Sequence, residues 1–372
     1  MPPEERTSVV TPAACCVIGA GLVGLATAFE LASRGHPVTV IDPEPMSGAS
    51  HHAAGMLAPA AEIQYGQDNL VPLMRASMAL YPDLVQRVAA ASGCPTGYLT
   101  CGTIVVAADG ADRRHLRELA DFQHAAGMDV EVVTTRYLRQ LEPAIAPVVA
   151  GAALIPGDHQ IDPRVFGAAL MCALKKLGVR FEERKATPDD LGPKTVMAAG
   201  LGAAEYFPFL PLRPVWGEIM RLDVPDAMTP LVTHVIRGFV EDRPVYVVPR
   251  GNGSVVLGAT SRENHRKWGS LGGVYQLLRD GIRLVPGLEE CSISDIGTGG
   301  RPGTPDDLPL VGTDTATGTV ISTGYFRHGI LLTALAARLG AALVTGDRHV
   351  TGLDDRAVES ILTHTDPYRW SN

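Results

Sequence analysis

The chain has 372 residues, of which 46% are hydrophobic and 19% are charged. At about 150 residues per domain, this length predicts two or three domains, and the apolar content argues against a disordered protein. The formal net charge of −8 lacks the basic excess that is typical of nucleic-acid-binding proteins. We therefore expect a globular protein that does not bind nucleic acid.

The six cysteines form no CxxC pair, which argues against a zinc ribbon or a disulfide scaffold, and free thiols favour a cytoplasmic location. The stretch from Thr11 to Phe29 carries no charge and in this respect resembles a membrane span. However, it contains glycines in a fixed pattern, and no cationic segment precedes it. We interpret it as a buried strand, a turn and a helix. We expect no membrane partner, and the sequence leaves open whether the protein forms a homo-oligomer.

The hydrophobic pattern predicts alternating strands and helices after a loose tail at residues 1–12. A strand at 13–18, a glycine turn, a helix at 26–34 and a strand at 37–41 form a βαβ unit, whose two strands should be parallel. The elements predicted next are a helix at 69–91, a strand at 102–107, a helix at 113–126, a strand at 130–133, a helix at 167–177 and a strand at 195–199.

The pattern changes between residues 214 and 259, where short strands alternate with Gly, Pro and Asp turns. This texture predicts a mainly antiparallel sheet. Its expected strands are 219–222, 231–236, 245–248 and 254–257. The α/β pattern then returns with a strand at 319–322 and a helix at 330–344, so the order of the elements predicts two interleaved domains.

A GxGxxG motif at Gly19, Gly21 and Gly24 follows the first predicted strand and opens the first helix, and Asp42 ends the next strand. Gly19 permits a tight turn, Gly21 leaves room for a pyrophosphate, and Gly24 lets the helix pack closely. Asp42 would accept hydrogen bonds from the adenosine ribose. The motif predicts a dinucleotide site, the alternative being a glycine turn without a ligand, and it does not distinguish FAD from NAD.

Further motifs make the chain resemble the D-amino-acid oxidase superfamily of flavoproteins, and within it glycine oxidase of the thiamine pathway. The series covers nearly the whole chain and is far more specific than the glycine turn alone. Its members are residues 48–50, 54–59, 157–164, 198–200, 212–217, 246–250, 258–260, 300–306 and 324–330.

The resemblance implies FAD as the cofactor and an α/β fold with two interleaved domains. The first is a Rossmann-like FAD-binding domain, residues 8–93, 150–210 and 285–372. The second is a mainly antiparallel β substrate-binding domain, residues 94–149 and 211–284.

The same resemblance implies roles for three cationic or polar side chains. The Arg301 guanidinium would clamp the substrate carboxylate through two parallel hydrogen bonds, where the alternative is a surface ion pair. The Tyr246 hydroxyl would touch that carboxylate, although a tyrosine in the core is a rival reading. Arg327 would help to position the substrate, whereas Arg250 would serve the structure.

The cofactor contacts implied by the resemblance come from several parts of the chain. The backbone N–H groups of Gly329 and Ile330, at a helix start, would face the flavin N1–C2=O region, where the alternative is an ordinary turn. The other implied contacts are Ser50, His51, His52, Gly55, Met56, Gly200, Arg301, Arg327 and His328.

Some positions depart from the glycine oxidase pattern. His51 and His52 resemble the histidine stretch of dimethylglycine and sarcosine dehydrogenases, in which a histidine is joined covalently to the flavin. A covalent link at His52 is therefore one prediction, and non-covalent FAD beside this histidine is the one that the other motifs favour. The chain is short between residues 181 and 195. Trp216 and Ser261 suggest a substrate other than free glycine.

The implied reaction is oxidative deamination of glycine or a small N-substituted glycine. A hydride would pass from Cα to flavin N5, the resulting imine would give glyoxylate, and O2 would be reduced to H2O2. One alternative is an oxidase or dehydrogenase that cleaves a larger N-carboxymethyl amine of a specialised pathway, and another is a flavin-binding protein without turnover. The sequence offers no catalytic triad, paired carboxylates or metal motif, and we expect no metal.

Overall fold

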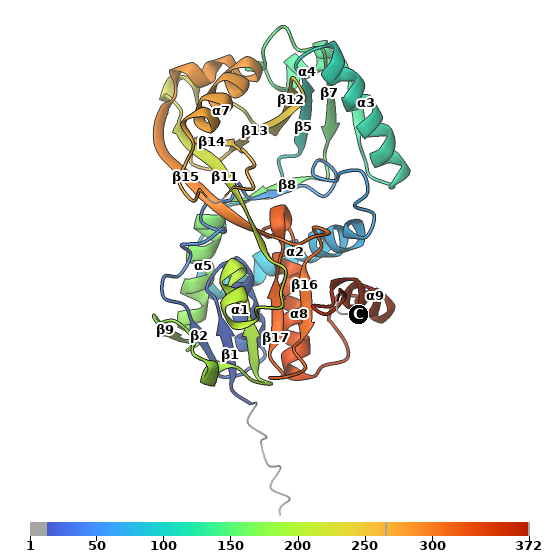
Figure 1. Cartoon of the computed structure of the whole chain (residues 1–372). Helices are drawn as coiled ribbons and strands as arrows, with labels where there is room; N and C mark the ends of the chain where they lie inside the picture. Colours follow the sequence, from blue (N-terminus) through green and yellow to red (C-terminus); the bar gives the residue numbers. More distant parts are fainter. Residues whose placement is uncertain (1–12, 265, 371–372) are drawn as a thin grey trace, which may run out of the picture.

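The computed structural model describes residues 13–264 and 266–370 (Figure 1). The tail expected at residues 1–12 lies outside the described residues. Two large sheets occupy opposite ends of the molecule, and a small three-stranded sheet lies between them (Figure 1). The small sheet consists of β3 (Met56–Leu57), β8 (His159–Ile161) and β4 (Tyr98–Leu99).

The six-stranded sheet has the order β16-β17-β10-β1-β2-β9. All neighbouring pairs are parallel except β16 and β17. The strands are β1 (Cys15–Ile18), β2 (Val38–Ile41), β9 (Arg180–Glu182), β10 (Thr195–Met197), β16 (Leu310–Thr313) and β17 (Val320–Thr323). The predicted βαβ unit is confirmed, because a short apolar strand that is buried on both faces suits the interior of a parallel sheet.

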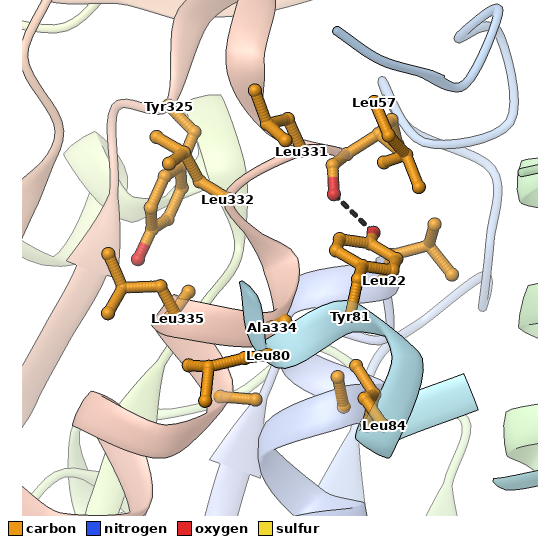
Figure 2. Packing of buried hydrophobic residues seen from close by; sticks show 14 of the residues in the cluster. Leu22, Leu57, Leu80, Tyr81, Leu84, Tyr325, Leu331, Leu332, Ala334 and Leu335 are labelled. Atoms are coloured by element: carbon orange, nitrogen blue, oxygen red, sulfur yellow. Dashed lines mark hydrogen bonds between the residues drawn. The ribbon is translucent and has the colours of Figure 1, made fainter. Parts of the chain in front are cut away.

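Helices cover both faces of this sheet. On one face α1, α2, α5 and α8 pack against one another, and the short helix α6 lies on the other. The helices of this half are α1 (Leu22–Ser33), α2 (Leu70–Ser92), α5 (Pro163–Lys176), α6 (Ala203–Tyr206), α8 (Thr333–Thr345) and α9 (Asp355–Thr365). Figure 2 shows the apolar packing where α2 meets the start of α8, with Tyr81 at its centre.

The eight-stranded sheet has the order β15-β11-β14-β13-β12-β5-β7-β6 and is mainly antiparallel, as predicted. The pairing of β12 with β5 is parallel. The strands are β5 (Thr103–Ala107), β6 (Glu131–Val133), β7 (Gly151–Ile155), β11 (Arg213–Asp223), β12 (Val235–Val240), β13 (Arg243–Pro249), β14 (Val255–Gly258) and β15 (Ser292–Gly303).

Helices α4 (Thr135–Leu141) and α7 (Leu271–Leu284) cover one face of this sheet through an apolar cluster. Helix α3 (Gly110–Ala125) packs on β5 and β7. Because side chains alternate along a strand, Val245 and Val247 point into the cluster, while Tyr246 between them belongs to the opposite face. That opposite face carries the polar residues discussed below.

One predicted strand, 231–236, is shifted in the structure, where β12 begins only at Val235. The backbone N–H groups of Thr233 and His234 donate to the Glu142 carboxylate at 2.8 and 2.7 Å. A side chain therefore satisfies the donors that a strand partner would otherwise take.

The two large sheets divide the chain at points that differ from the predicted domain boundaries. β7 and β15 belong to the eight-stranded sheet, although both lie in ranges predicted for the FAD-binding domain. β15 pairs with β11 along its whole length, and a sequence pattern does not reveal such a distant partner. Within the described part of the chain, no helix is both long and apolar enough for a membrane crossing.

Candidate functional site

A cavity of about 420 Å³ lies between the carboxyl ends of the parallel strands and the polar face of the eight-stranded sheet. Ligands of open α/β sheets bind at such strand ends, and the volume is typical of a ligand site. Most of the predicted site residues line it: Gly19, Gly21, Asp42, Ser50, His52, Gly55, Met56, Gly200, Tyr246, Arg301, Arg327, Gly329 and Ile330. Gly24, His51 and His328 lie outside the lining.

The glycine turn between β1 and α1 leaves no room for side chains. Gly19 has a φ of 104°, and a Cβ there would lie 2.5 Å from the Ala198 carbonyl oxygen. A Cβ on Gly24 would lie 1.9 Å from the Gly19 carbonyl oxygen. Gly24 therefore permits the close contact between the helix and the turn, so it shapes the site although it does not line the cavity.

The same turn presents donors and an acceptor to the cavity. Helix α1 has no acidic residue in its first turn, so its positive end is left for an anion. The Asp42 carboxylate accepts from the Ala20 N–H at 2.6 Å and the Glu44 N–H at 2.8 Å, and Ser50 Oγ accepts from the Leu22 N–H at 3.1 Å. An open turn, the positive end of α1 and a carboxylate that faces the cavity fit the pyrophosphate and ribose of a dinucleotide.

A second group of backbone donors reaches the cavity from the segment before α8. Gly329 and Ile330 line the cavity. From behind, the Tyr81 hydroxyl donates to the Ile330 carbonyl (Figure 2), and Ser77 Oγ donates to the Leu331 carbonyl at 2.6 Å. Since both side chains belong to α2, this helix holds the segment in place.

His328, predicted as a cofactor contact, lies behind the cavity wall. Its ring is 1% exposed, and neither ring nitrogen has a hydrogen-bond partner among the described residues. Burial, together with the positive charge of Arg327, lowers the pKa of His328 to about 4, so the ring is neutral at pH 7. Its Nδ1 lies 4.0 Å from the Glu62 carboxylate.

The two adjacent histidines play different parts. His52 lines the cavity, and its ring packs over Gly297 of β15, where a Cβ would lie 2.5 Å from His52 Nδ1. Burial, then the nearby His51 and Arg164, lower the pKa of His52. The His51 carbonyl accepts from Arg164 Nε and Arg221 Nη2, each at 3.2 Å, which fixes the loop that carries His52.

Two glycines make room for the predicted substrate-binding side chains. A Cβ on Gly258 of β14 would lie 2.5 Å from the Tyr246 hydroxyl of neighbouring β13. A Cβ on Gly217 of β11 would lie 2.4 Å from Arg301 Nη1 on neighbouring β15. The Tyr246 ring and the Arg301 guanidinium therefore extend over the neighbouring strand instead of pointing straight away from the sheet.

Arg301 and Arg327 both present a guanidinium to the cavity. Arg301 Nη1 donates to the Thr260 carbonyl at 3.2 Å. Within the described residues, neither arginine has a carboxylate within ion-pair distance. Burial, and the positive charges of Arg237 and Arg301, lower the pKa of Arg327. The arrangement favours an anionic ligand, because a carboxylate would relieve the repulsion between these partly buried cations.

Sequence reasoning missed Glu62 and Arg237, which line the cavity as a buried ion pair. Although burial opposes it, Arg237 and Arg327 hold the pKa of Glu62 below its ordinary value. The sequence signal that could have indicated this pair is Arg237 itself, a charged residue inside the apolar run of β12. Arg250, expected to be structural, donates to the Gln160 side chain at 2.5 Å and the Ala54 carbonyl at 2.6 Å.

The described residues contain no group of three or more His, Cys, Asp or Glu side chains that could hold a metal ion. A dinucleotide turn and a guanidinium for an anion open onto one cavity. The fold and the glycine turn are those of a dinucleotide-dependent enzyme.

Comparison with known proteins identifies the family to which the chain belongs. The model of a family described as FAD dependent oxidoreductase, DAO, matches residues 14–343. The chain belongs to this family, and its cofactor is FAD. The residues around the glycine turn fit that cofactor.

The relatives include glycine oxidase of Geobacillus kaustophilus, 31% identical over 91% of this chain and 94% of that protein. Its crystal structure has a TM-score of 0.82 and covers 95% of this chain and 98% of that one, at 30% identity. The bifunctional protein ThiO/ThiG of Nostoc sp. is 32% identical over 88% of this chain. The chain spans about half the length of that bifunctional relative, 52%.

The structure of iminodiacetate oxidase from Chelativorans sp. has a TM-score of 0.78 at 22% identity, which shows the shared fold. It covers 89% of this chain and 95% of that one. The chain is therefore an FAD-dependent oxidoreductase of this family, and it is similar to glycine oxidase over almost its whole length.

Proposed function

We propose that this protein oxidises the C–N bond of glycine or of a small N-substituted glycine. The observation that carries the proposal is the pair of guanidinium groups, Arg301 and Arg327, that reach the cavity beside the Tyr246 hydroxyl without a carboxylate partner among the described residues. Bound FAD would supply the oxidising chemistry, taking a hydride from the substrate Cα and passing the electrons to O2 to give H2O2. Water would hydrolyse the imine to glyoxylate and an amine.

Arg301 would orient the substrate by a bidentate contact with its carboxylate, and Tyr246 would donate a third hydrogen bond. Holding the carboxylate at one fixed point aims Cα in one direction, and this orientation is the main contribution expected from the chain's own residues. Arg327 would help to position the substrate. Its positive charge and that of Arg301 would also disfavour an ammonium group nearby, so that the amine binds in its neutral form.

The positive end of α1 and the carboxylate of Asp42 would hold the pyrophosphate and the adenosine ribose of FAD. The Gly329 and Ile330 N–H groups would face the flavin pyrimidine ring, where they would favour negative charge. We propose that FAD is held without a covalent bond, with His52 as a neutral side chain at the cavity wall.

Anaerobic mixing with glycine, sarcosine and D-alanine tests the proposal through loss of the flavin absorbance. The variant R301M should keep its FAD, shown by an unchanged flavin-to-protein ratio, and should raise KM for glycine at least about a hundredfold, since a charged hydrogen-bond pair is lost. R180M, a change at the exposed ion pair of Arg180 with Glu182 outside the cavity lining, is the matched control. Wild-type protein whose flavin is reduced by none of these amines would overturn the proposal.

A further inference from the structure

A third guanidinium faces the cavity from the side of Tyr246 that is remote from Arg301. Arg237 of β12 is 5% exposed, and it lines the cavity. Its Cα is paired with that of Tyr246 on β13, so both side chains stand on the same face of the sheet as direct neighbours. Arg301 comes from β15, at the far edge of the same sheet. Tyr246 therefore lies between two cationic groups.

The guanidinium of Arg237 is only partly satisfied. Its Nη1 pairs with Glu62, and the structure gives neither Nε nor Nη2 a hydrogen-bond partner among the described residues. A guanidinium can bind two acceptors along separate edges, so the pair with Glu62 leaves donor capacity for another carboxylate.

The charges around Tyr246 do not balance. Arg237, Arg301 and Arg327 line the cavity together with Tyr246 and Glu62, which gives three positive side chains and one negative side chain at this end of the cavity. Glu62 acts on both Arg237 and Arg327, so one substrate carboxylate bound to Arg301 would leave these two guanidinium groups with a single negative charge between them, and uncompensated charge of this kind is unfavourable. A ligand with two carboxylates would bring the number of negative charges to that of the positive charges.

We propose that Arg237 forms a subsite for a second carboxylate, and that the substrates are secondary amines with two acidic groups, that is, N-carboxymethyl amino acids. This inference rests on the proposed function. The carboxymethyl carboxylate binds Arg301, and the second carboxylate binds Arg237. Loss of a hydride from the carboxymethyl carbon and a proton from nitrogen forms the C=N bond, with O2 taking up the electrons through FAD. Water then adds, the C–N bond breaks, and glyoxylate and the amino acid leave.

Binding of two ligands that contain no amine tests the subsite without turnover. Methoxyacetate and diglycolate share a carboxymethyl ether, and diglycolate adds one carboxylate at the other end. Titration of the FAD-loaded protein, followed by the change in flavin absorbance, gives both dissociation constants. We expect diglycolate to bind at least about tenfold more tightly, as a charge-assisted hydrogen bond to a buried group allows. Equal or weaker binding of diglycolate would overturn the subsite.

Substitution of both residues of the Glu62–Arg237 ion pair tests whether Arg237 causes the preference for diglycolate. The double variant E62Q/R237M removes both charges together, so that no unpaired carboxylate is left buried. We expect it to bind the two ligands within about twofold of each other, while R237K in the wild-type background keeps part of the preference. A preference for diglycolate that survives in the double variant would overturn the role of Arg237. If the double variant does not fold, the wild-type comparison still decides the subsite.

Iminodiacetate and sarcosine form the corresponding pair of substrates. We expect a higher kcat/KM for iminodiacetate in the wild type and loss of that advantage in the double variant. Oxidation of sarcosine and glycine without any preference for dicarboxylates would refute the subsite and leave the proposed function intact. No flavin reduction by any of these amines would refute the proposed function itself.

Discussion

The Tyr246 hydroxyl lies over Gly258, on the neighbouring strand, at a place where an added Cβ would be only 2.5 Å away. The tyrosine keeps its position because its neighbour has no side chain. The ring is partly buried, and burial raises the pKa of Tyr246, so the hydroxyl keeps its proton and can donate a hydrogen bond at neutral pH. A glycine thus controls the orientation of a side chain that we propose to contact substrate.

The variant G258A should displace the Tyr246 ring. Overpacking of this kind costs roughly 1–3 kcal/mol in the free energy of unfolding, and loss of the hydroxyl contact should raise KM for glycine about tenfold. Thermal unfolding and steady-state kinetics measure the two effects. Gly157, whose Cβ would meet nothing within 4 Å, provides the control variant G157A. An unchanged KM in G258A would remove Tyr246 from the substrate site.

The variant Y81F should weaken FAD binding, although Tyr81 does not line the cavity. It removes one of the two donors to the buried Ile330 carbonyl, which keeps the Thr333 N–H at 3.2 Å, and loss of one hydrogen bond costs about 0.5–1.5 kcal/mol. Because this cost falls mainly on the FAD-bound state, in which the segment before α8 is held against the cofactor, the dissociation constant of FAD should rise about two- to tenfold. Fluorescence titration of the apoprotein with FAD measures it.

Y98F is the matched control, because the Tyr98 ring stacks on Tyr81 with ring centroids 6.5 Å apart, while its hydroxyl forms a hydrogen bond with His159 in another region. We expect Y98F to bind FAD with the wild-type affinity. Equal loss of affinity in the two variants would show that α2 packing matters rather than the hydrogen bond to Ile330.

Asp158 should make the protein less stable as pH rises. Burial raises the pKa of this carboxyl to about 7, even though it accepts from the Ala60 and Ala61 N–H groups. In the unfolded chain it titrates near 3.8, so between about pH 4 and pH 7 the folded state binds more protons. The free energy of unfolding therefore falls with pH in this window, by at most about 1.4 kcal/mol per pH unit from this group.

The variant D158N removes this contribution. Denaturant unfolding of both proteins between pH 4.5 and 7.5 gives the difference curve, which should rise in favour of the variant with increasing pH. His328, whose low pKa has the opposite effect, is common to both proteins and cancels. A flat difference curve would contradict the raised pKa of Asp158.

Acid precipitation should leave a colourless pellet, with FAD in the supernatant, if the cofactor is held without a covalent bond. The physical reason is that helix dipoles and hydrogen bonds are lost when the protein unfolds, whereas a covalent link survives. A yellow pellet would contradict this prediction. The variant H52A would then identify the attachment, because its pellet should lose the colour.

The βαβ unit and its glycine turn were predictable because their signals are local: a short apolar run, spaced glycines and a terminal Asp42. Tyr246 and Arg301 were predicted from motifs, and the structure places both at one cavity. The pair of Glu62 with Arg237 was not predictable, since it joins a loop to a strand far along the chain. β15 was missed because glycine and serine dominate it and its order comes from pairing with β11.

The strand order of the six-stranded sheet has a consequence for synthesis of the chain. β1, near the start, lies beside β10, and β10 lies beside β17, which is made only at residues 320–323. While the ribosome is still adding residues, the early strands have an open edge and a half-built nucleotide pocket. This sheet is therefore complete only when β17 has left the ribosome, and until then β10 lacks one of its two neighbours.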